Sequence, residues 1–129
     1  MKIPENKETF DTEIGTYWFD DDGLLNSLSK KPTRTVENTR SNFELVKRIT
    51  NNQKVCHLVY LTNSKKPDKA TIDFVNSELP KVYKAMAMVS KSGVGEIIMN
   101  VLFKFMKPVI PMKTFTNETE ARNWLKQYL

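Results

Sequence analysis

The sequence contains a single cysteine, Cys56, and a single histidine, His57, in 129 residues. One cysteine excludes a disulfide bond within the chain and is typical of a reducing compartment, so we expect a cytoplasmic protein. Zinc and iron centres need several His, Cys or carboxylate ligands, which this pair cannot supply. Neighbouring strand residues point to opposite faces, so the two cannot form a nucleophile–base pair either. We expect structural roles: core packing for one and an ordinary strand position for the other.

Glycine and long apolar runs are also scarce. The four glycines form no phosphate-binding loop and no dinucleotide fingerprint, since Gly93-Val94-Gly95 lacks the third glycine of that motif. No stretch reaches the ~20 apolar residues of a membrane span, and the polar start, Met1–Thr9, predicts no signal peptide. Asp20-Asp21-Asp22 lacks the alternation of a calcium loop. With no acid–base pair at a supporting spacing, we expect no enzymatic activity, no metal and no cofactor.

The composition is that of an ordinary globular protein, with 40% apolar and 27% charged residues. No internal repeat and no long linker rich in glycine, serine or proline divides the chain. We therefore predict a single domain over residues 1–129, with residues 1–11 as a flexible N-terminal extension.

The charge is unevenly distributed along the chain. Residues 1–30 carry three Lys and seven Asp or Glu, a net charge of −4, whereas residues 31–129 carry seventeen Lys or Arg and eight Asp or Glu, a net charge of +9. A basic body suits an anionic membrane surface or nucleic acid. The charges are dispersed rather than clustered, so a solvated lysine-rich surface is the simpler interpretation.

The apolar pattern predicts strands that alternate with helices. Strands are expected at 13–19, 24–28, 55–61, 85–89 and 108–115, and helices at 35–50, from 67 to about 83, at 92–107 and from 116 or 117 onward. Asp22-Gly23 predicts an antiparallel hairpin between the first two strands, and Pro80 is expected to break the second helix. The order β-β-α-β-α-β-α-β-α predicts an α/β fold, with a mixed sheet of about five strands and about four helices.

One predicted helix has more apolar surface than a surface helix of a small domain needs. On a helical wheel, residues 93–107 show a thin polar stripe, a wide apolar face and a further apolar flank formed by Met99, Phe103 and Met106. Methionine and phenylalanine suit adaptable contacts. Three interpretations stay open: deep burial within the monomer, a homodimer interface, or a surface for a lipid or other apolar ligand.

Several structural residues carry a family resemblance over about residues 12–129. They are Trp18, the hairpin Asp22-Gly23-Leu24-Leu25, the inner strand Ala85-Met86-Ala87, the helix around Ile97 to Phe105, and the ending Pro111–Phe115 through Ala121 and Trp124-Leu125. With this order of elements, the chain resembles the STAS domain, the sulfate-transporter and anti-sigma-factor-antagonist, or SpoIIAA-like, fold. It is most similar to the small bacterial STAS/CRAL-TRIO-like proteins of uncharacterised function.

The resemblance implies a SpoIIAA-like α/β fold and a non-enzymatic module that binds a partner or ligand. Anti-sigma antagonists of this fold are switched by phosphorylation of a serine after the buried strand, in an Asp-Ser-Ser-Gly-like motif. The corresponding stretch here, 61–66, lacks the Asp and the Gly, which leaves Ser64 as a candidate phosphorylation site outside the family's motif. The similarity to CRAL-TRIO lipid-transfer domains implies an apolar ligand.

Two functional hypotheses follow from these observations. The first is a STAS-like regulatory or protein-interaction module that forms a homodimer or binds a protein partner. The second is a protein that binds a lipid or small apolar ligand and associates peripherally with membranes through its basic surface. Nucleic-acid binding is disfavoured, because the aromatic run Tyr17–Phe19 lies in the acidic N-terminal region, where a phosphate backbone would be repelled.

Overall fold

The strands form one mixed sheet whose order in space follows the order in the chain. A computed structural model of the chain describes residues 3–30, 33–61, 67–90 and 108–129. The sheet has six strands in the order β1-β2-β3-β4-β5-β6. Their bounds are β1 Phe10–Asp11, β2 Gly15–Phe19, β3 Leu25–Ser29, β4 Val55–Tyr60, β5 Tyr83–Val89 and β6 Met112–Phe115. The first three strands pair antiparallel, and β3 to β6 pair parallel.

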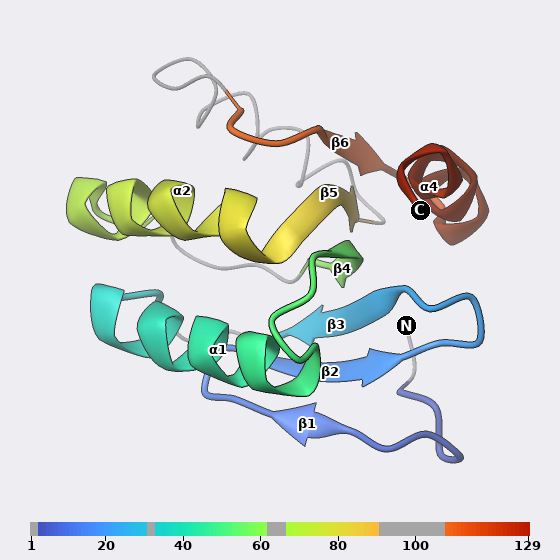
Figure 1. Ribbon diagram of the computed structural model, residues 1–129, viewed down its shortest axis with the longest axis horizontal. Helices are drawn as coiled ribbons and strands as arrows, with labels where there is room; N and C mark the ends of the chain where they lie inside the picture. Colours follow the sequence, from blue (N-terminus) through green and yellow to red (C-terminus); the bar gives the residue numbers. More distant parts are fainter. Residues whose placement is uncertain (1–2, 31–32, 62–66, 91–107) are drawn as a thin grey trace.

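Helices cover both faces of this sheet in the described part of the chain (Figure 1). Helices α1 (Val36–Ile49) and α2 (Lys69–Val82) lie side by side on one face, joined by an ion pair between Lys47 and Glu78 at 3.0 Å. Helix α4 (Glu118–Leu125), followed by the 3-10 helix η1 (Lys126–Tyr128), packs on the other face. The parallel strands are therefore buried on both sides, as the nearly continuous apolar run of β4 predicts.

Local sequence signals explain where the helices begin and end. Thr35 caps α1 and forms a capping box with Asn38, and Asn117 caps α4, its side-chain oxygen accepting from the Glu120 amide at 2.8 Å. Asn51 and Asn52 have positive φ angles of 53° and 59° and end α1, since asparagine tolerates this left-handed conformation better than most residues.

The predicted hairpin between β2 and β3 is confirmed. Gly23 has a φ of 80°, which a residue with a Cβ atom rarely adopts. The Asp20 carboxylate accepts from the backbone amides of Asp22 and Leu24 at 2.9 and 3.0 Å. The acidic cluster therefore serves as a turn, the structural role expected for it.

Three details of the predicted fold are wrong. The sheet has six strands rather than about five, because the two-residue strand β1 pairs with β2 inside the segment expected to be a flexible extension. Pro80 does not break α2: it stands in the last turn, where the burial of Leu79 and Val82 offsets the hydrogen bond that proline cannot donate. Strand β6 begins only at Met112, later than predicted, where pairing with β5 begins. The predicted helix at 92–107 lies outside the described residues.

Candidate functional site

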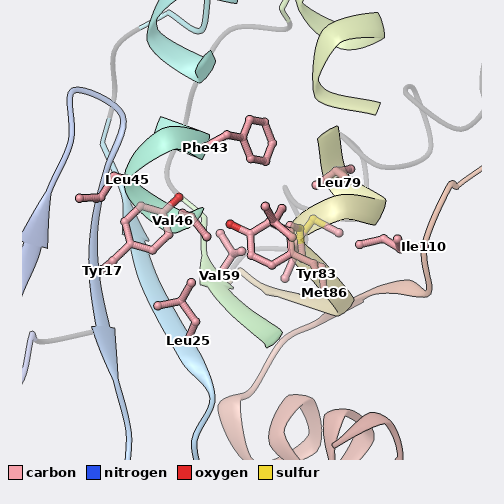
Figure 2. Packing of buried hydrophobic residues seen from close by; sticks show 12 residues of the cluster. Tyr17, Leu25, Phe43, Leu45, Val46, Val59, Leu79, Tyr83, Met86 and Ile110 are labelled. Atoms are coloured by element: carbon pink, nitrogen blue, oxygen red, sulfur yellow. The ribbon is translucent and has the colours of Figure 1, made fainter. Parts of the chain in front are cut away.

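A cavity of about 240 Å³ lies between the sheet and the layer formed by α1 and α2. Its walls are mainly apolar, with Phe43 from α1, Leu79 from α2, and Val59 and Met86 from β4 and β5. Figure 2 shows these side chains gathered around the space between the two layers. These residues belong to the larger hydrophobic cluster, and the cavity that they line is partly open to solvent.

His57 is one of several buried polar residues that line this cavity, and it is only 3% exposed. Its Nε2 atom lies 2.8 Å from the Ser27 hydroxyl on the neighbouring strand β3. Its Nδ1 atom has no hydrogen-bond partner among the described residues. Burial lowers the pKa of His57 to about 3, so the imidazole is neutral at physiological pH. In either neutral tautomer Nδ1 is left as an unmatched donor or acceptor.

Two tyrosines enclose the His57 ring. The ring centroid of His57 lies 5.6 Å from that of Tyr17 and 4.6 Å from that of Tyr83, with interplanar angles of 26° and 22°. The Tyr17 hydroxyl accepts from the Asn42 side-chain amide at 2.7 Å. Burial raises the pKa of both phenols, so the stack carries no charge near neutral pH. Figure 2 shows the two phenol oxygens on the sides where the rings face each other.

Arg34 is the one charged side chain among the described residues that line the cavity. Its Nη2 atom donates to the Ile14 carbonyl at 3.4 Å. Burial lowers the pKa of this guanidinium, although arginine remains charged at any physiological pH. The cavity therefore combines an apolar wall, a neutral polar stack and a single positive charge.

The opposite face of the sheet has charged groups as well, but these serve packing. Arg122 of α4 forms ion pairs with Asp20 of the hairpin and, at 2.8 Å, with Glu118, and it donates to Asn26 at 3.2 Å. These contacts connect α4 to the turn between β2 and β3. No cavity is needed to account for them, so we assign this network a structural role.

The sequence singled out two groups of residues. Met99, Phe103, Met106 and Ser64 fall outside the described residues, so the structure does not place them. Cys56 and His57 do point to opposite faces, as predicted: Cys56 is in the cluster under α4 and His57 lines the cavity. His57 was given only a structural role from the sequence. The signal that could have identified it is one histidine within an otherwise apolar buried strand.

No group of three or more His, Cys, Asp or Glu side chains in the described ranges could hold a metal ion. Within the same ranges, every helix is too short or too polar to cross a membrane.

Comparison with known proteins places the chain in a family. The family model described as a domain of unknown function (DUF7793) matches residues 17–129. This match covers most of the chain, and the chain belongs to this family. No curated protein and no solved structure matches it.

Proposed function

We propose that this member of the DUF7793 family binds a small, mainly apolar molecule in the cavity between the sheet and the α1–α2 layer. The observation that carries the proposal is a cavity of about 240 Å³ that contains the buried, unpartnered Nδ1 atom of His57. Native buried polar atoms nearly always have a partner, so an exception inside a cavity points to a ligand or an ordered water.

The size of the cavity supports a ligand more strongly than water alone. Protein interiors are packed about as densely as organic crystals, and voids much larger than a water molecule are few. The cavity is partly open to solvent and its walls are mainly apolar, so water inside it would find few hydrogen-bond partners. An apolar ligand would remove this apolar wall from water, which is favourable.

The volume of the cavity also limits the size of the ligand. An engineered cavity of about 150 Å³ binds benzene, and scaling by volume gives roughly ten non-hydrogen atoms for this cavity. The described cavity therefore suits a fragment-sized molecule or the end of a chain, and is too small for a whole membrane lipid. The proposed role is binding rather than catalysis: the Ser27 hydroxyl lies 2.8 Å from His57 Nε2, but burial lowers the pKa of His57 to about 3, which makes the imidazole a weak base for activating a serine.

Methyl NMR of the methionines tests this proposal directly. Met86, Met88 and Met112 line the cavity. Xenon and indole are suitable neutral probes, and we expect both to shift the signals of these three methionines. Val75→Trp should fill the cavity and abolish the shifts, while Ser77→Trp, on the exposed side of the same helix, should preserve them. Unchanged cavity signals with every probe would contradict the proposal.

A STAS-like regulatory or protein-interaction module is our second proposal. It is supported by the order of the elements: an antiparallel hairpin, then parallel strands joined through α1 and α2, with α4 on the opposite face. On this proposal Met99, Phe103 and Met106 form the contact with a second copy or a protein partner. Native mass spectrometry tests it, since a dimer that Phe103→Glu converts into a folded monomer supports the module, and a monomeric wild type argues against the homodimer.

Phosphorylation of Ser64 and peripheral membrane association are two further proposals, and each can be tested separately. Phosphorylation of Ser64 would appear as a phosphopeptide when the protein is isolated from its own host. Peripheral membrane association would appear as co-sedimentation with anionic vesicles at low salt, lost at high salt because the attraction to the basic body is screened.

A further inference from the structure

The hydrogen bond between Ser27 and His57 decides which nitrogen of the buried imidazole carries the proton. The Ser27 hydroxyl lies 2.8 Å from Nε2 and has His57 as its hydrogen-bond partner, whereas Nδ1 has no partner among the described residues. If Nε2 carried the proton, both the Ser27 hydroxyl hydrogen and the Nδ1 lone pair would be unmatched. If Nδ1 carries it, Ser27 donates to Nε2 and only the Nδ1–H group is unmatched. Buried polar groups nearly always have partners, so the Nδ1–H tautomer is favoured.

The imidazole therefore offers a ligand a hydrogen-bond donor that is already held in place. The His57 ring stacks with Tyr17 and Tyr83, and its Nε2 atom is bound to Ser27, so the plane of the ring is fixed. A donor that is ordered before the ligand arrives loses little conformational freedom on binding. A ligand with an acceptor at Nδ1–H would supply the partner that the described residues do not.

The acceptor is expected to be a neutral group. A carboxylate that moves from water into a mainly apolar space needs several donors or a counter-charge. The neutral imidazole has no charge to offer, and Arg34, the charged residue of the described lining, has interactions of its own within the protein. A carbonyl oxygen loses much less on the same transfer and suits a single donor.

Resting on the proposed function, we infer that the ligand is a small, mainly apolar carbonyl compound whose oxygen accepts a hydrogen bond from Nδ1–H of His57. Its apolar body lies against Phe43, Leu79 and Met86. The volume estimate of roughly ten non-hydrogen atoms fits an aryl ketone, an aryl aldehyde or a short branched ketone.

The tautomer is tested in the wild-type full chain, so this measurement does not depend on whether any variant folds. Long-range ¹H–¹⁵N NMR distinguishes the two neutral tautomers, and the chain has a single histidine, which gives one set of imidazole signals. We expect the Nδ1–H tautomer, and we expect acetophenone to shift the Nδ1 signal more than the Nε2 signal. The Nε2–H tautomer would overturn the inference.

Binding is tested with acetophenone and α-methylstyrene, which has nearly the same shape and a CH₂ group in place of the carbonyl oxygen. Both are titrated into the full chain and followed by the methyl signals of Met86, Met88 and Met112. The two probes differ in hydrophobicity, so the ratio of their affinities in the wild type is compared with the ratio in a variant, which cancels that difference.

A double variant, Ser27→Ala with His57→Phe, removes the donor. It replaces both partners of the buried hydrogen bond by apolar groups and keeps an aromatic ring beside the two tyrosines. We expect acetophenone to lose about tenfold in affinity relative to α-methylstyrene, the effect of one buried hydrogen bond. Tyr60→Phe is the matched control with an unchanged ratio, because Tyr60 is on the same strand but packs under α4 and does not line the cavity.

The outcomes separate this inference from the proposed function. If both probes bind and the ratio of their affinities is the same in the wild type and the double variant, the cavity binds ligands but the carbonyl inference is wrong. If acetophenone, α-methylstyrene and xenon all leave the methionine signals of the wild type unchanged, the proposed function itself is overturned. A change of the ratio in the double variant, absent in Tyr60→Phe, supports both.

Discussion

The two faces of the sheet are packed differently, and the hydrophobic cluster under α1 and α2 is the larger of the two. Under α4, small residues such as Ala85, Ala87 and Ala121 are completely buried, which lets the helix lie close to the strands. Under α1 and α2, large side chains leave a cavity of about 240 Å³. We call the face under α4 the close face and the face under α1 and α2 the cavity face. The close face is packed without such a space among the described residues, and the cavity face has room and polar groups for a ligand.

The partly buried arginines show the same contrast. Burial alone would lower the pKa of Arg122, but hydrogen bonds and charges from Asp20 and Glu118 outweigh it and raise the pKa. Burial lowers the pKa of Arg34 by more than the attraction to Tyr17 raises it. The folded protein therefore favours the charged form of Arg122 and disfavours that of Arg34.

The largest expected effect is a truncation on the close face. Leu125→Ala should reduce the free energy of unfolding by roughly 3 kcal/mol, because Leu125 is fully buried against tightly packed neighbours that cannot collapse into the space. Leu79→Ala, the matched truncation beside the cavity, should cost less, since its neighbours already border empty space. Urea unfolding measures both. Equal losses would contradict the contrast between the faces.

The pH dependence of stability probes the cavity face through His57. Its pKa is lowered to about 3 in the folded protein, so between pH 3 and 6.5 the unfolded chain binds the extra proton. Stability should therefore fall as the pH decreases, by roughly 2 kcal/mol from pH 7 to pH 5. His57→Gln should remove most of this slope in urea unfolding at several pH values, and a wild type without the slope would contradict the burial of a neutral histidine.

A moderate effect is expected for the ion-pair network of the close face. Arg122→Gln should reduce the free energy of unfolding by about 1–2 kcal/mol, because it leaves the partly buried Asp20 carboxylate without its partner. Lys126→Gln is the control, since Lys126 is exposed in η1. Thermal unfolding compares the two. A loss no larger than that of the control would show that the network does not hold α4 to the hairpin.

The smallest effect is expected for the arginine of the cavity face. Arg34→Gln should change the free energy of unfolding by less than about 0.5 kcal/mol, because removing a cation that burial disfavours releases part of its desolvation cost. Urea unfolding without ligand measures this change. A loss as large as that for Arg122→Gln would show that the contacts of Arg34 outweigh the cost of its burial.

Much of the fold could be predicted because its signals are local. Asp22-Gly23 predicted the hairpin through the φ angle it needs, and helices were predicted at 35–50 and from 116 or 117 onward, close to where Thr35 and Asn117 cap the backbone. The predictions that were wrong concern features that are set by contacts between residues or segments rather than by a local signal. Strand β1 exists through pairing with β2, and α2 continues through Pro80 because Leu79 and Val82 are buried.

The candidate site was predictable only in part. The alternation of a strand correctly placed Cys56 and His57 on opposite faces. Ser27, His57, Tyr17 and Tyr83 come together only because β2, β3, β4 and β5 lie side by side in the sheet. Nothing in their separations along the chain indicates that they meet, and of the stack only His57 stood out in the sequence, as the single histidine.

By itself, the sequence determined the alternation of strands and helices, the hairpin, the caps and which side of β4 each residue faces, because each depends on interactions between residues a few positions apart. Only the tertiary structure decided that two layers of large side chains leave a cavity, that His57 is neutral inside it and that Arg34 lines it. Those properties depend on how the side chains of different segments fill space and on how far they exclude water. Both are set only when segments distant in the sequence pack together.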